Sequence, residues 1–155
     1  MASSADRFVA AARDRGLIVD VQRWPEGTRT ARDAARAVGC DVGQIVKSLV
    51  MMADGGPLVV LTSGANQVDV ARVALLIGAA AVRKATADEA RAATGYSIGG
   101  TPPLGFPEPL TVLMDADLFA YSQVWAAAGT PQTVFSAPPE ALRAAAGARR
   151  AVVAR

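Results

Sequence analysis

The spacing of apolar residues changes along the chain between a helical and a strand period, and turn-forming residues separate the segments. The first helix is predicted where Ala5, Phe8 and Ala12 recur at i, i+3 and i+7. Polar N-caps and glycines mark the ends of other helices, as at Thr30 and Gly39. The segments predicted as helices are 5–16, 30–39, 68–77, 86–95 and a stretch that follows Pro138-Pro139.

Short apolar runs bounded by glycine, proline or polar residues predict strands. The turn Asp54-Gly55-Gly56-Pro57 joins two of these runs, so we expect them to pair as a hairpin. Because helices and strands interleave while some strands are adjacent, the predicted fold class is mixed α/β, with a mixed sheet rather than a purely parallel one. The segments predicted as strands are 17–21, 44–53, 58–62, 80–83, 111–114, 123–127, 132–135 and 151–154.

The length of 155 residues is that of one ordinary domain, and no linker, low-complexity tract or repeat divides the chain, so residues 1–155 are predicted to form a single domain. No stretch has the roughly 20 consecutive apolar residues of a membrane helix. The first residues lack the basic and apolar regions of a signal peptide. Cys40 is the only cysteine, which excludes an internal disulfide. We therefore expect a cytoplasmic protein without a membrane partner.

The chain contains no histidine, and this absence narrows the possible chemistry. It excludes a histidine general base, a Ser-His or Cys-His couple and a histidine-ligated zinc ion. Hydrolysis would have to use carboxylates, a lysine, hydroxyl groups, backbone amides or the substrate itself, and we expect neither a cofactor nor a metal. The net charge of +2 is compatible with nucleic-acid binding but does not establish it.

Lys47 is unusual because only Lys47 and Lys84 among the 16 basic side chains are lysines, and Lys47 lies inside the apolar run 45–52. In a strand, its side chain shares a face with Ile45 and Met51. An ammonium on an apolar face must be paired, uncharged or directed into a cleft, because burying it alone is very costly. Two interpretations of Lys47 are open. It is a functional group, which binds a phosphate or carboxylate or acts as a base. Alternatively, it is an edge-strand residue that reaches water.

A loop rich in glycine and proline follows the fourth predicted helix. The N–H groups of Gly99, Gly100 and Thr101 can form a concave nest for an anion or oxyanion, whereas Pro102 and Pro103 supply none. The segment is neither a P-loop nor a dinucleotide-binding turn. A rigid structural loop is the alternative interpretation, although so long a loop in a compact domain is more often functional.

Four further residues have simpler interpretations. Thr30 and Ser63 precede predicted helices, where they cap, although the helix after Ser63 could also hold a phosphate. Asp115 follows a strand and either caps the next turn or positions a water molecule. Cys40 has no base partner and is interpreted as core filler rather than as a nucleophile.

Taken in order along the chain, these segments resemble the YbaK-like editing family associated with prolyl-tRNA synthetase. The resemblance covers most of the chain, and the lysine strand together with a Gly-x-x-x-Pro loop is its specific part. It implies a mixed α/β fold with a curled, barrel-like sheet surrounded by helices, in which the lysine and the glycine loop line one cleft. The matching segments are 30–35 with Gly39, 45–49, Val68-Asp69 with Gly78, 95–103, Asp115 and 125–131.

The resemblance also implies a reaction, which is hydrolysis of the ester between a mischarged amino acid and the terminal adenosine of tRNA, often tRNA for proline. Lys47 would bind the terminal phosphate or the aminoacyl group. The amides of Gly99, Gly100 and Thr101 would orient the ester carbonyl and stabilise its developing charge. A ribose hydroxyl of the substrate and a positioned water would assist, which suits a chain without histidine. The substrate-binding residues implied are Thr30, Ser63, Pro102, Pro103 and Asp115.

Two alternatives remain open from the sequence. One is a non-catalytic module that binds a nucleotide or RNA end in the same cleft, or docks on a synthetase, because the chain has no conventional nucleophile or base. The other is a purely structural domain in which Lys47 is an edge residue. The amino acid that is removed does not follow from the sequence, because relatives that use histidine for discrimination have no counterpart here.

Overall fold

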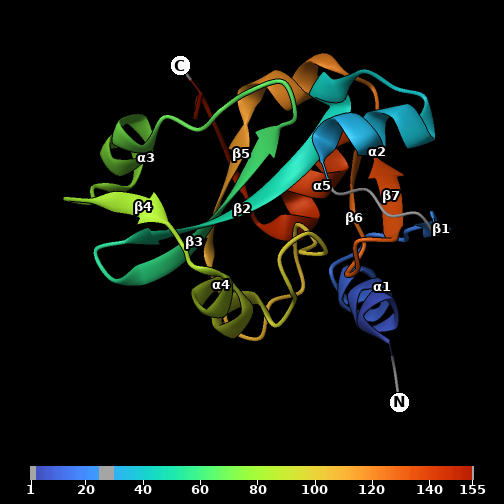
Figure 1. Ribbon diagram of the computed structural model, residues 1–155, viewed down its shortest axis with the longest axis horizontal. Helices are drawn as coiled ribbons and strands as arrows, with labels where there is room; N and C mark the ends of the chain where they lie inside the picture. Colours follow the sequence, from blue (N-terminus) through green and yellow to red (C-terminus); the bar gives the residue numbers. More distant parts are fainter. Residues whose placement is uncertain (1–2, 25–29, 155) are drawn as a thin grey trace.

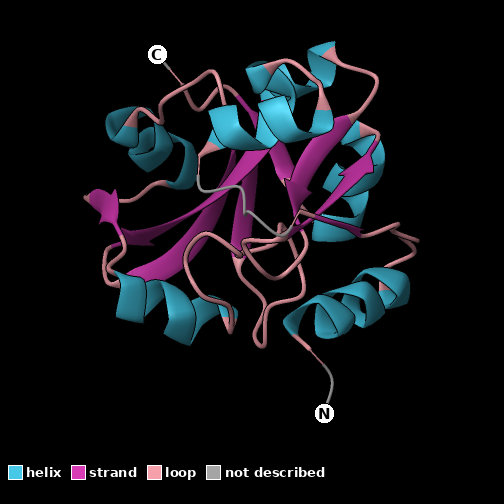
Figure 2. Cartoon of the chain, turned by 45° about the vertical axis from the view of Figure 1, so that its right-hand side comes forward, coloured by secondary structure: helices cyan, strands magenta, loops and turns pink. Residues whose placement is uncertain are grey.

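The computed structural model of the chain describes residues 3–24 and 30–154, and helices lie on both sides of a central sheet (Figure 1, Figure 2). The predicted caps mark real helix ends. The Thr30 side chain caps the second helix, and Gly39, in the left-handed region at φ 74°, ends it. The helices are α1 (Ser4–Asp14), α2 (Ala31–Val38), α3 (Val70–Ile77), α4 (Ala87–Thr94) and α5 (Pro139–Ala146), with the 3-10 turns η1 (Val42–Gln44) and η2 (Ala116–Ala120).

The eight strands form one sheet with both parallel and antiparallel pairs, as predicted. Its order is β1-β7-β6-β2-β3-β5-β8, and β4 is added to β2. Within the described residues this ladder ends in β1 and β8 without closing, so the curled sheet is open rather than a closed barrel. The strands are β1 (Gln22–Arg23), β2 (Ile45–Ala53), β3 (Gly56–Ser63), β4 (Val82–Lys84), β5 (Thr111–Asp115), β6 (Val124–Ala127), β7 (Thr133–Ala137) and β8 (Arg149–Ala151).

Two strands, one near each end of the chain, differ most from the residue ranges that the apolar pattern predicts. Residues 17–21 do not join the sheet, and β1 forms directly after them, where β7 supplies hydrogen-bonding partners. At the C-terminal end, residues 149–151 pair with β5, whereas the predicted strand was 151–154. In both places the position of the partner strand, rather than local apolarity, determines where pairing occurs.

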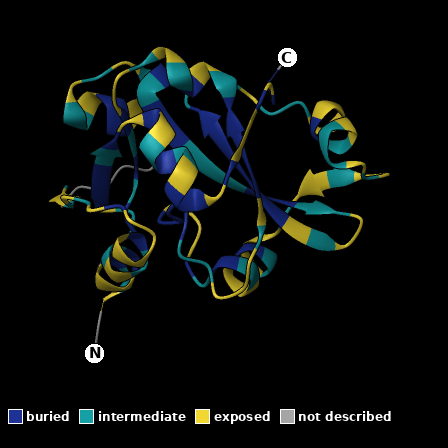
Figure 3. Cartoon of the chain, turned by 180° about the vertical axis from the view of Figure 1, so that it is seen from behind, coloured by how far each residue is buried: buried dark blue, intermediate teal, exposed yellow. Residues whose placement is uncertain are grey.

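Successive side chains of β2 alternate between two faces of the sheet. Val46 and Val50 pack in the larger core, to which α1, α4 and α5 contribute. Met51 packs with α3 in a second core, and Ile45 packs with α2 in a third, smaller cluster. Figure 3 shows the central strands as mostly buried and the outer faces of the helices as exposed. Lys47 therefore shares a face with Ile45 and Met51, as predicted, between the clusters of α2 and α3.

Glu89 makes the start of α4 sensitive to acid. Its carboxylate accepts hydrogen bonds from Arg83, at 2.7 and 2.8 Å, and from the Thr86 N–H, and these lower the pKa of Glu89 from 4.5 to about 2. Because only the folded chain brings these donors together, their contribution to stability is complete above about pH 4.5 and is lost as the pH falls toward 2. We expect Glu89→Gln to lower the Tm at pH 7 and to have a smaller effect at pH 3. A difference in Tm that is the same at both pH values in thermal unfolding would contradict this.

Candidate functional site

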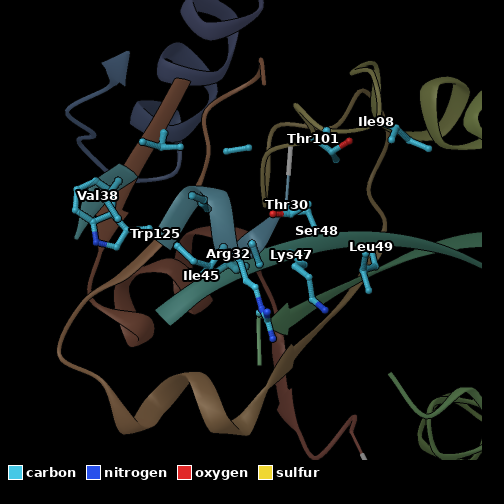
Figure 4. A pocket seen from close by; sticks show the side chains of 18 residues that line it. Thr30, Arg32, Val38, Ile45, Lys47, Ser48, Leu49, Ile98, Thr101 and Trp125 are labelled. Atoms are coloured by element: carbon cyan, nitrogen blue, oxygen red, sulfur yellow. The ribbon is translucent and has the colours of Figure 1, made fainter. Parts of the chain in front are cut away.

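A pocket of about 540 Å³ opens along β2, where this strand changes partners (Figure 4). Its volume lies within the range of about 300–1,000 Å³ that is typical of small-ligand sites. The start of α2, the strands β2 and β6 and the loop after α4 form its walls. Its polar side chains belong to Thr30, Arg32, Lys47, Ser48 and Thr101.

The ammonium of Lys47 is half-buried and bonded to the protein. Its Nζ donates to the main-chain oxygen of Asn66 at 2.7 Å. Burial lowers the pKa of Lys47 below its ordinary value, the charge of Lys84 lowers it further, and the carboxylate of Asp115 opposes both. In Figure 4, Lys47 and Arg32 extend in the same direction, away from the glycine loop. Lys47 is therefore not an edge lysine whose ammonium lies in bulk water, as the alternative interpretation required.

The pKa of Lys47 can be tested directly because the chain has two lysines. Lys84→Ala removes the positive charge that lowers this pKa, so we expect the pKa of Lys47 to rise in the variant. Lys47 is then the only lysine, and its side-chain ¹³Cε resonance can be titrated without overlap. An unchanged or lower pKa relative to the wild-type chain would show that Lys84 does not act on this ammonium.

A buried carboxylate holds the turn that Lys47 contacts. Asp115, which is 2% exposed, accepts from the Ser63 N–H at 3.0 Å and from Asn66 Nδ2 at 2.9 Å. Its other oxygen accepts from the Asp117 N–H at 3.0 Å. Asn66 Nδ2 also donates to the Asp117 carboxylate at 2.8 Å. The Asn66 side chain is thereby fixed between two carboxylates, and with it the carbonyl oxygen that binds Lys47.

The loop after α4 has two amide groups that are available to a ligand. Gly99 and Thr101 line the pocket, and within the described part of the chain their N–H groups donate no hydrogen bond. The N–H of Gly100 instead donates to the Ser97 carbonyl at 3.1 Å, and the Thr101 hydroxyl donates to the same oxygen at 3.1 Å. Gly100 thus closes the turn, while Gly99 and Thr101 keep their amides free.

Gly100 also lets this loop pack against a second one. A Cβ atom at this position would lie 2.7 Å from the Cα and 2.9 Å from the carbonyl carbon of Thr130. These are backbone atoms that cannot yield easily, so the contact requires glycine. Pro102 and Pro103 follow and are buried, as is Leu104, which is 1% exposed in the larger core. The loop is therefore anchored in the core on one side of the two free amides.

Residues 25–145 match the family model described as the aminoacyl-tRNA editing domain. The chain belongs to this family. The solved structure "Crystal structure of a putative trans-editing enzyme for prolyl tRNA synthetase" is similar to this editing domain with a TM-score of 0.93 and 44% sequence identity. The similarity covers 100% of this chain and 99% of the other.

Two relatives of known sequence show different shares of overlap with this editing domain. "Putative Cys-tRNA(Pro)/Cys-tRNA(Cys) deacylase EbsC" of Enterococcus faecalis is 28% identical over 120 residues, which are 77% of this chain and 73% of that protein. Proline--tRNA ligase of Ligilactobacillus salivarius is 33% identical over 90 residues, which are 58% of this chain and 16% of the ligase. The editing domain therefore corresponds to most of the first relative and to a small part of the second.

The structure brings some of the predicted site residues together and separates others from the pocket. Those that line the pocket of this editing domain are Thr30, Lys47, Gly99 and Thr101. Gly100, Pro102 and Pro103 are buried next to them in the same loop. Ser63 and Asp115 do not line the pocket, because they bond to each other and the Ser63 hydroxyl donates to the Gly43 carbonyl at 2.8 Å.

Three residues of the site were not predicted from the sequence. Arg32 lines the pocket but is one of many arginines, so no pattern distinguishes it. Ser48 follows Lys47 and points to the other face of β2, which strand alternation could have indicated. Asn66 contributes its main-chain carbonyl oxygen to Lys47, and no pattern in the sequence indicates a main-chain contact of this kind.

Two features are not found in the described residues, 3–24 and 30–154. They contain no helix long and apolar enough to cross a membrane. They also contain no group of three or more cysteine or acidic side chains that could hold a metal ion. Burial raises the pKa of the Cys40 thiol, and Asp41 adds to the effect, so this thiol stays protonated at neutral pH.

Proposed function

We propose that this editing domain is an aminoacyl-tRNA deacylase that acts in trans. It hydrolyses the ester between a mischarged amino acid and the 3′-terminal adenosine of tRNA, with tRNA for proline as the carrier. The observation that carries the proposal is one pocket, in a member of the editing family, that is lined both by a half-buried lysine and by two loop residues with free amides. The names of two relatives, a Cys-tRNA(Pro) deacylase and a trans-editing enzyme, support the choice of carrier.

The two kinds of polar group act on different parts of the substrate. The Gly99 and Thr101 amides donate to the ester carbonyl oxygen and stabilise the negative charge that develops when water attacks the carbonyl carbon. The bond from that carbon to the ribose oxygen then breaks, and a proton passes to the ribose oxygen. The adjacent ribose hydroxyl of the substrate supplies that proton to the departing oxygen and accepts the proton of the attacking water in exchange, since the chain has no histidine to do so.

Lys47 binds the phosphate of the terminal nucleotide in this proposal. Its ammonium exchanges the Asn66 carbonyl for the phosphate, a stronger partner because it is charged. Thr30 contacts the substrate from the start of α2. Ser63, Pro102, Pro103 and Asp115 act by holding the walls of the pocket rather than by touching the substrate. The remaining parts of the proposal are a cytoplasmic location and an aminoacyl-tRNA synthetase as a docking partner.

A non-catalytic module that binds a tRNA end is the second candidate, because no carboxylate, thiol or imidazole is among the described side chains that line the pocket. A panel of aminoacyl-tRNAs separates the two. It should include proline tRNA charged with alanine, cysteine and serine, and release of each amino acid is measured against the uncatalysed rate. Accelerated release from at least one substrate supports the deacylase. Binding of proline tRNA without release from any charged form would establish the binding module instead.

A further inference from the structure

One edge of β2 is open over four residues, next to the pocket. On this edge β2 pairs with β6 through Ile45 and Val46, and with β4 from Met51 onward. Between these two contacts, residues 47–50 have no partner strand on this edge within the described part of the chain, whereas their other edge pairs with β3. Ser48 and Leu49 of this segment line the pocket.

The backbone groups that point to the open edge can be assigned from their neighbours. The Ile45 carbonyl accepts from the Gly64 N–H on the β3 side, and the Val50 carbonyl accepts from the Ala85 N–H on the opposite side. Because the direction alternates from residue to residue, the N–H and C=O of Ser48 and the N–H of Val50 point to the open edge. The edge therefore presents a donor, an acceptor and a donor in succession.

Two further observations indicate that this segment takes a ligand. The Ser48 hydroxyl oxygen is buried and has no hydrogen-bond partner among residues 3–24 and 30–154, although nearly all buried polar atoms have one. Ile98, which is 59% exposed, lines the pocket from the glycine loop and supplies an apolar contact. The gap is short, about 13 Å for four residues, and β6 and β4 close it at both ends. An added peptide strand would be blocked there, whereas a planar ring is not.

We infer that the open edge of β2 binds the adenine base of the substrate's terminal nucleotide, an inference that rests on the proposed function. The Ser48 carbonyl accepts from the exocyclic N6 amino group, and the Val50 N–H donates to the adjacent ring nitrogen, N1. Adenine offers a donor beside an acceptor, which complements this acceptor beside a donor. The base lies along β2 between Ile98 and the strand, and places the ribose and its ester toward Gly99 and Thr101.

Nucleotide binding to the full chain tests the inference without any need for activity. The three probes are AMP, inosine monophosphate and purine riboside monophosphate. Inosine monophosphate has an acceptor at position 6 and a donor at N1, the reverse of AMP, and purine riboside monophosphate lacks the amino group. We expect AMP to shift the amide resonances of Ser48 and Val50 more than those of Lys47 and Leu49, which face β3. The other two nucleotides should bind about tenfold more weakly or worse, the change that one hydrogen bond of about 1.4 kcal/mol produces. Equal binding of all three, or AMP shifts confined to other residues, would overturn the inference.

Kinetics with a modified substrate separate this inference from the proposed function. Charged tRNA that ends in purine riboside in place of adenosine should have a KM about tenfold higher with little change in kcat, because the lost hydrogen bond is made equally in the ground and transition states. Equal KM values for the two substrates would overturn the adenine assignment while leaving the deacylase intact. If no charged tRNA is hydrolysed but AMP still shifts Ser48 and Val50, the deacylase proposal fails and the adenine site stands.

Discussion

Lys47→Ala is expected to slow deacylation at subsaturating enzyme by about 10–10²-fold, the loss that follows removal of one hydrogen bond of about 1.5–3 kcal/mol to a charged group. The ammonium is half-buried, and its carbonyl partner Asn66 is fixed by Asp115 and Asp117. A cation held in this way is oriented before the substrate arrives, so its loss removes binding that solvent cannot replace. The measurement is single-turnover release of the amino acid from charged proline tRNA.

The matched control for this variant is Lys84→Ala. It makes the same change of charge at the only other lysine, which is exposed on β4 and does not line the pocket. We expect Lys84→Ala to retain most of the activity and both variants to keep the wild-type circular dichroism spectrum. Equal losses in the two variants would show that overall charge, and not the position of Lys47, supports the reaction.

Gly100→Ala is expected to have a comparably large effect through the backbone. The added Cβ would lie 2.7 Å from Thr130 Cα, so the glycine loop or the neighbouring turn has to move. We expect a loss of about 1–3 kcal/mol in the free energy of unfolding, the usual cost of overpacking. A displacement of about 1 Å in the Gly99 and Thr101 amides would lower the rate by about 10²-fold. Chemical denaturation and single-turnover kinetics measure the two effects separately.

Gly56→Ala is the control for this second variant. Gly56 lies at the start of β3 and has a negative φ, and a Cβ there would meet only the Ala53 carbonyl at 3.7 Å, an ordinary contact. Its effect on both stability and rate should be small. Activity of Gly100→Ala at the level of Gly56→Ala would show that close packing of the two loops is not needed for catalysis.

Local signals in the sequence were sufficient to predict most helices and the central hairpin of β2 and β3. Caps at Thr30 and Thr86 and glycines at the helix ends depend on neighbours within four residues, so they form the same way in any tertiary context. The turn between β2 and β3 is similar, since Asp54 and Gly55 both adopt positive φ, at 50° and 86°. Asp and Gly are residue types that adopt such angles readily.

The sequence also limits the chemistry that is possible. The absence of histidine and the single cysteine exclude the common catalytic couples in any fold, and they leave Lys47 and the amides of the glycine loop as candidate groups. Strand alternation placed Lys47 on the face of Ile45 and Met51, which the structure confirms. The association with aminoacyl-tRNA editing came from the resemblance of these segments to a known family, and the family match confirms it.

Tertiary structure alone decided how these parts form a site. Whether β2 has an open edge depends on where β4 and β6 end, and those strands lie far from it in the sequence. The burial of Asp115 beneath the turn at Asn66, the packing of Gly100 against Thr130 and the position of β1 likewise follow from partners distant along the chain. Local propensity carries no information about such partners, because the free energy of strand pairing and of buried hydrogen bonds depends on groups that only folding brings together.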